Sequence, residues 1–170
     1  MTLRRPAFLH QTLIRIVALG MLLLAAGAAG AQEAPPLSTG QTLYLPVYSH
    51  FYHGDTDRSG KPSESLTSAH ISIRNTDSTA GLKVSAARYY DTDGKLLKDY
   101  LPAPRTIPPL GTLELFVPHT DVSGGSGANF IIVWNAESAI NPPLVEALHA
   151  DIRASRSVVF ITTARAIRPR

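Results

Sequence analysis

Short runs rich in valine, isoleucine, tyrosine and phenylalanine recur along this chain, and each is bounded by glycine, proline, asparagine or aspartate. In residues 68–74 the alternation is sharp, because Ala69, Ile71 and Ile73 stand between polar neighbours. Successive side chains of a strand point to opposite faces, so such a run buries one face of a sheet. The same pattern predicts strands at residues 43–52, 82–90, 95–101, 112–117, 130–134 and 158–163.

Residues 142–153 are compatible with two structures. A helix could begin at the prolines and would align Leu144, Val145, Leu148 and Ile152. A strand would instead place Leu144, Leu148, Ala150 and Ile152 on one side, with Glu146 as the exception. The turn residues Ser155 and Arg156 and the β-branched run after them favour a hairpin of two strands.

Seven or eight short strands without an internal repeat predict an all-β fold. We expect a single antiparallel β-sandwich of the immunoglobulin-like type over residues 41–167. Trp134, the only tryptophan, is expected to anchor its core from a central strand. The chain has no cysteine, so the core must stabilise the fold without disulfides.

The first 31 residues have the features of a signal peptide. Arg4, Arg5 and Arg15 are basic, and the apolar run at residues 16–26 is shorter than the ~20 residues that span a bilayer. Ala29-Gly30-Ala31 fits a cleavage site, and an uncleaved anchor is the alternative. Residues 32–40 are polar and contain prolines, which is typical of a spacer. We therefore expect an exported protein, periplasmic or secreted, without a membrane span after cleavage.

The charge of the chain changes when the leader is removed. The leader holds three of the 16 lysines and arginines and none of the 13 acidic residues, so the remainder carries 13 of each. A nucleic-acid partner needs a concentrated basic surface, which this balance does not supply. We therefore predict no nucleic-acid binding.

The stretch YLPVYSHFYHG, residues 44–54, is dense in aromatic side chains. In a strand, Tyr44, Tyr48, His50 and Tyr52 share one face, and Pro46 favours a sheet edge because it lacks an N–H group. Exposed tyrosines offer large contact area with few rotatable bonds. These four residues are therefore predicted to bind a ligand; the alternative is that a loop or the spacer covers them.

A metal site is a second hypothesis for the same region. His50 and His53 are three residues apart, so a regular strand points them to opposite faces, although a bulge could unite them with His70 around zinc. Asp55 and Asp57 resemble the first half of a calcium loop, but the glutamate expected at its twelfth position is absent. Zinc or calcium thus remains an alternative to a protein without a cofactor.

The sequence SGGSGAN at residues 123–129 predicts a long, flexible loop whose N–H groups could bind an anion. It lacks the Lys-Ser/Thr of a phosphate-binding P-loop and the final glycine of a nucleophile elbow. We predict no catalytic residues. Because binding residues are often carried by such loops, Asp121, Ser123, Ser126 and Asn129 are further candidates for ligand binding.

Five blocks occur in this order along the chain: YLPVYSHFYHG, ISIRNTD, YYDTDGKL, TDVSGGSGANFIIVW and NPPLVEA. In these blocks the chain resembles the family called domain of unknown function 3124, over about residues 41–167. The resemblance implies a secreted or periplasmic single domain, and it brings no activity, cofactor or catalytic residue to this chain. Some similar proteins carry a lipoprotein signal, which this cysteine-free sequence cannot provide.

Together these observations predict an exported, non-enzymatic module that binds a small ligand or an envelope protein. A metal-binding envelope protein is one alternative. A structural component of an envelope assembly, in which an open strand edge pairs with another chain, is the other.

Overall fold

The computed structural model describes residues 34–168, so the predicted signal peptide and the first two residues of the spacer lie outside the described residues. The described part is all-β and contains no helix. Its strands are β1 (Ser38–Pro46), β2 (His50–Thr56), β3 (Pro62–Leu66), β4 (Ser68–Arg74), β5 (Leu82–Tyr90), β6 (Leu96–Asp99), β7 (Arg105–Ile107), β8 (Thr112–Val117), β9 (Asn129–Ile140), β10 (Leu144–Ile152), β11 (Ser157–Thr163) and β12 (Arg165–Ile167).

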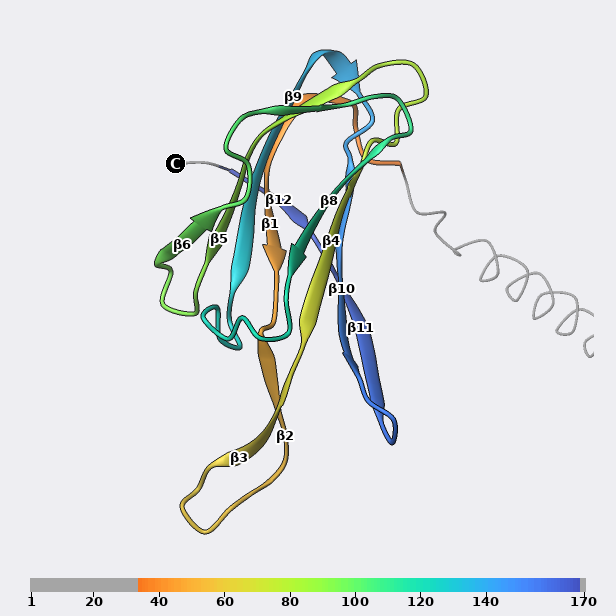
Figure 1. The fold of residues 1–170 in the computed structure, drawn as a ribbon. Helices are drawn as coiled ribbons and strands as arrows, with labels where there is room; N and C mark the ends of the chain where they lie inside the picture. The colour runs from red at the N-terminus through yellow and green to blue at the C-terminus, as the bar shows by residue number, and fades with distance from the viewer. Residues whose placement is uncertain (1–33, 169–170) are drawn as a thin grey trace, which may run out of the picture. The chain divides into compact units, whose positions relative to one another are not determined.

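These strands form two antiparallel sheets and a separate hairpin. The six-stranded sheet has the order β12-β1-β9-β5-β6, with β7 also paired to β5, and the four-stranded sheet has the order β11-β10-β4-β8. The two sheets face each other in a sandwich-like arrangement, and the β2-β3 hairpin projects beyond their end (Figure 1). The predicted antiparallel all-β fold is confirmed.

The strands predicted at residues 82–90 and 112–117 match β5 and β8 to the residue. Residues 142–153 form a strand, β10, which pairs with both β4 and β11. The predicted count of seven or eight strands is too low, because twelve are present in residues 34–168. The first predicted strand is divided into β1 and β2, and three further strands, β3, β7 and β12, arise in segments that show no alternation.

The immunoglobulin-like connectivity is not confirmed. In an immunoglobulin constant domain the first strand pairs with the second strand of the same sheet. Here β1 pairs with β9 and β12, whereas β4, the next strand of the sandwich, lies in the opposite sheet.

The core lies between the two sheets. Trp134 is almost fully buried on β9, the central strand between β1 and β5, as predicted. Opposite it, β10 buries Val145 and Ala147 and then two polar residues, His149 and Asp151. The side of β10 that carries Leu144, Leu148 and Ile152 faces solvent. The more apolar side of this strand is therefore the outer one.

Candidate functional site

The aromatic stretch does not form one continuous face. β1 ends at Pro46 and β2 begins at His50. In the segment between them, Val47 and Ser49 are buried at the end of the sandwich. There the Tyr48 N–H donates to Nε2 of His149 at 3.1 Å, and the Thr67 hydroxyl donates to the Tyr48 carbonyl. Tyr44 stays on β1, which lies between β12 and β9 and is not an edge strand. Tyr44 and Tyr52 are exposed, but they lie on β1 and on the separate β2-β3 hairpin, so the predicted single aromatic strand is divided.

Tyr48 belongs instead to a cluster that we call the mixed aromatic cluster, formed by Tyr48, Phe51, His149 and Phe160. The His149 ring stacks on Phe160 with centroids 4.5 Å apart and planes 4° apart. Tyr48 and Phe51 meet Phe160 edge-on at 5.7 and 5.9 Å. The cluster thus fastens the base of the β2-β3 hairpin to the β10-β11 hairpin.

His149 is neutral in this cluster. Burial lowers its pKa to about 4, and the nearby carbonyl groups of Ala147 and Phe160 oppose this shift in part. Because Nε2 accepts a hydrogen bond from Tyr48, the proton resides on Nδ1, which has no partner at hydrogen-bond geometry. A charged imidazole would be poorly solvated here.

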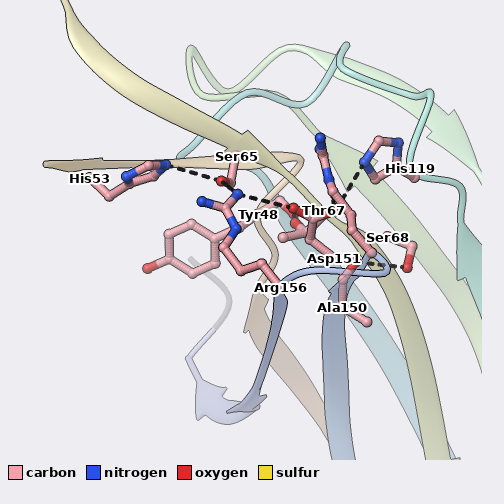
Figure 2. Close-up of polar contacts among 10 residues, drawn as sticks. Tyr48, His53, Ser65, Thr67, Ser68, His119, Ala150, Asp151 and Arg156 are labelled. Atoms are coloured by element: carbon pink, nitrogen blue, oxygen red, sulfur yellow. Dashed lines mark hydrogen bonds and ion pairs between the residues drawn. The ribbon is translucent and has the colours of Figure 1, made fainter.

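Asp151, next to this cluster on β10, is the centre of a polar network. Its side chain is 3% exposed and accepts from Nε of Arg153 at 2.8 Å. It also accepts from Nη2 of Arg156 at 3.5 Å (Figure 2). Nε2 of His119 lies 3.7 Å from the same carboxylate. The hydrogen bond from Arg153 is the main reason why the pKa of Asp151 is lowered, so the carboxylate is charged and paired at neutral pH.

The network continues into the β2-β3 hairpin. Arg156 also donates to Oγ of Ser65 at 2.7 Å, and Nε2 of His53 lies 3.0 Å from the same hydroxyl (Figure 2). The His53–Ser65 pair has the distance of a general base and a nucleophile. However, Ser65 is 2% exposed and its oxygen is occupied by Arg156, so the hydroxyl is not presented to a substrate. The contacts favour a structural link between the hairpin and the sandwich.

The predicted flexible loop is packed against the protein. The Ser49 N–H donates to Gly125 O at 3.0 Å, and the Thr92 N–H donates to Gly124 O at 3.0 Å. A Cβ on Gly124 would lie 1.9 Å from the Tyr89 hydroxyl, so only glycine fits there. The N–H groups of Gly125 and of the neighbouring Ser123 and Gly127 also donate within the protein. These groups are thus not available for the anion site considered from the sequence.

The remaining candidates, Asp121, Ser126 and Asn129, lie within the loop or at its end. Asp121 accepts hydrogen bonds from both the N–H and the hydroxyl of Ser123, which closes a local turn. Ser126 is half-buried in the same loop, and Asn129 begins β9, where it is paired with Pro46 and Tyr90. The loop touches the chain near Tyr48 through the hydrogen bond from the Ser49 N–H to Gly125 O.

The proposed metal ligands are dispersed. His50 contacts the ring of Tyr52 on one face of β2, and His53 lies on the other face with Phe51. His70 lies on the four-stranded sheet, 3.4 Å from Glu114. Within residues 34–168 no group of three or more metal-ligating side chains is close enough to hold an ion.

Asp57, from the calcium hypothesis, closes the tip of the β2-β3 hairpin. Its Oδ1 accepts from the N–H and hydroxyl of Ser59 and from the N–H of Lys61, which lowers its pKa. Asp55, the other candidate, is exposed on β2. The aspartate at the third position of the proposed calcium loop, Asp57, is thus already engaged in the turn.

Sequence reasoning missed a surface on the four-stranded sheet. We call it the outer apolar face; its apolar side chains are 39–74% exposed and are Phe116, Leu144, Leu148, Ile152, Val159 and Ile161. The register places Leu148 beside Ile161 and His70, and His70 beside Phe116, so the row crosses all four strands. A signal existed in the alternation of β10, but its inner side also carries apolar residues, so the exposed side could not be recognised.

Ion pairs lie within this face, because His70 stands between Leu148 and Phe116 in the register and Glu146 lies between Leu144 and Leu148 on β10. Arg74 lies 3.0 Å from Glu146, and His70 lies 3.4 Å from Glu114. A hollow of about 200 Å³ between these pairs is lined by Leu148 and Ile161 among others. Residues 34–168 contain no helix of sufficient length and hydrophobicity to cross a membrane.

Comparisons with known proteins give a family and one distant structural likeness. No curated protein matches the chain. A crystal structure of Thermotoga maritima 1070 aligns with 12% identity and a TM-score of 0.41, over 79% of this chain and 96% of the other. The family model "Protein of unknown function (DUF3124)" matches residues 40–167, which is most of the sandwich and the hairpin. The chain therefore belongs to the DUF3124 family, as the five sequence blocks indicated.

Proposed function

We propose that this protein is an exported, non-enzymatic interaction module that binds another folded protein on its outer apolar face. The observation that carries the proposal is the set of five exposed apolar side chains on the neighbouring strands β10 and β11, with exposed Phe116 on β8 beyond His70 of β4. Exposed apolar residues that are scattered singly are ordinary, whereas a contiguous patch marks an interaction site.

The mixed character of the face supports a protein partner. Interfaces combine apolar contacts with hydrogen bonds, and the Arg74–Glu146 and His70–Glu114 pairs place polar groups among the apolar side chains. The hollow beside Leu148 and Ile161 has room for a single side chain of the partner. Six of the eight residues that line it are polar or charged, so we expect the partner to insert a side chain that packs on Leu148 and Ile161 and also forms hydrogen bonds.

A non-enzymatic role is supported by the state of the polar groups. The one serine–histidine contact in the polar network has a buried serine, and Asp151 is neutralised by arginines. Export is proposed from the leader features at residues 1–31.

Site-specific photo-crosslinking tests the proposal. A photoreactive residue at Leu148 should capture a foreign protein from envelope extracts, and the same residue at Lys98, on the other sheet, should not. Adding Phe116→Lys, at the opposite end of the row, should abolish the capture while the circular dichroism spectrum stays unchanged. Equal capture at Lys98, or capture that is insensitive to Phe116→Lys, would contradict the proposal.

A further inference from the structure

The edge strands of the two sheets differ in how they are protected against pairing with other chains. Natural edge strands are kept short, or carry charges and prolines. Here β12 has three residues and begins with Arg165, and β6 has four residues and ends in Lys98 and Asp99. The edge strand β8 carries Glu114 and is followed directly by Pro118.

β11 has none of these protections. It is seven residues long, lies at the end of the four-stranded sheet and pairs only with β10. Its sequence, SVVFITT, contains no charge, proline or glycine and five β-branched residues. Such a strand pairs readily with another of its kind.

The free edge of β11 can be assigned to particular backbone groups. The Ala164 N–H donates to Val145 O at 2.9 Å, just beyond the end of β11. In an antiparallel pair the bonding residues alternate, so the even-numbered residues of β11 bond to β10. The N–H and C=O groups of Val159 and Ile161 therefore point away from the sheet.

We infer that β11 pairs antiparallel with β11 of a second copy of this chain, about a two-fold axis at Phe160. This register places Val159 of each copy opposite Ile161 of the other and Ser157 opposite Thr163. The apolar pair lies on the exposed side of both strands, as cross-strand contacts require. A second copy of β11 is therefore the partner strand whose residues match those of β11 in this register.

The charges at the strand ends permit this arrangement. Arg156 falls opposite Ala164 and Arg165 opposite Ser155, so no arginine meets another arginine. The two four-stranded sheets become one continuous sheet, and their outer apolar faces become adjacent. The inference goes beyond the proposed function, because the pairing is made by the backbone groups at the edge of the sheet, although Val159 and Ile161 also belong to the outer apolar face.

Sedimentation velocity of the purified protein tests the inference. A single strand pair is a small interface, so the dimer should appear within a range of about 1 µM to about 300 µM. Val159→Pro removes only an N–H that faces the free edge and should leave a monomer at every concentration. Ile161→Lys should do the same by placing charges opposite an apolar neighbour. Leu96→Lys, at an exposed position of the edge strand β6, should dimerise like the natural chain.

Circular dichroism and the urea midpoint establish whether each variant is folded. If Val159→Pro does not fold, Ile161→Lys alone tests the dimer contact. A natural chain that is monomeric throughout the range overturns the inference, as does a dimer that survives in Ile161→Lys. Equal loss of the dimer in Leu96→Lys would assign the contact elsewhere and also overturn it. A monomer would leave the crosslinking result at Leu148 untouched, so the two proposals fail separately.

Discussion

Two aromatic clusters lie at different places in this sandwich, and they are built differently. The apolar cluster consists of Tyr89 on β5, Phe130 on β9 and Tyr100 just after β6, with Tyr89 stacked on Phe130 at 4.9 Å. Burial raises the pKa of Tyr100 to about 12, and the Tyr89 hydroxyl is bonded to Ser49. The mixed aromatic cluster contains an imidazole with one unpaired nitrogen and a half-buried Phe160.

The difference shows that one cluster stabilises the sandwich and the other attaches the β2-β3 hairpin to it. The apolar cluster is closed around the Tyr89 hydroxyl, which bonds to Ser49 and against which Gly124 fits. The mixed aromatic cluster joins a projecting hairpin to the sandwich and includes a group that titrates. We expect the first to govern global unfolding and the second to govern how the hairpin is held.

The largest expected effect comes from the same substitution in each cluster. Phe130→Ala should lower the free energy of unfolding by about 3–5 kcal/mol, because Phe130 is fully buried. Phe160→Ala should cost only about 1–2 kcal/mol, because part of its ring is already hydrated. Urea denaturation measures both, with the exposed Phe116→Ala as a control that should change little. Equal losses at the two sites would remove the distinction between the clusters.

The second prediction concerns acid. The pKa of His149 is about 4 in the folded protein and about 6.5 when unfolded, so between these values the unfolded chain binds more protons. Stability should therefore be complete above pH 6.5 and fall by up to about 3 kcal/mol as the pH drops to 4. The measurement is the urea midpoint at a series of pH values.

His149→Gln is the matched control, because an amide can still accept from the Tyr48 N–H but does not titrate. The slope between pH 4 and 6.5 should disappear in this variant. Asp77, whose pKa is lowered to about 2 mainly by the Thr79 N–H, loses its contribution only below about pH 3.8. A slope that persists in His149→Gln would assign the effect to other groups.

The smallest effect is expected from the arginines of the polar network. Arg156→Ala removes the hydrogen bond to Ser65 and should speed hydrogen exchange of the β2-β3 hairpin amides. The free energy of global unfolding should change by less than about 1 kcal/mol, since Arg156 is half-exposed. Arg153 contacts the same carboxylate but not the hairpin. Arg153→Ala should therefore leave hydrogen exchange of the hairpin amides unchanged. The same acceleration in both variants would refute a specific tether.

Alternation predicted the long strands well because one face of each is buried. β5 and β8 follow from this rule, whereas the central position of Trp134 was predicted because residues 130–134 are apolar on both faces. His149 and Asp151 could not be predicted as buried residues, since they occupy the polar half of the β10 pattern. Their burial depends on Tyr48, Phe160 and two arginines that are distant in sequence or lie in a turn.

The short strands were missed for a related reason. β7 and β12 have three residues each, and three residues are too few to display a period. They are strands because β5 and β1 present backbone groups for them to pair with. The glycine-rich loop was expected to be flexible, yet its packing follows from contacts with Thr92 and Tyr89.

The order of residues alone determined that this chain forms antiparallel strands, needs no disulfide and belongs to the DUF3124 family, because alternation and family blocks are local properties. Only the tertiary structure decided which side of β10 faces water and which edge strand stays open. Both depend on pairing between segments far apart in the chain, and the free energy of such pairing cannot be inferred from the sequence of one segment alone.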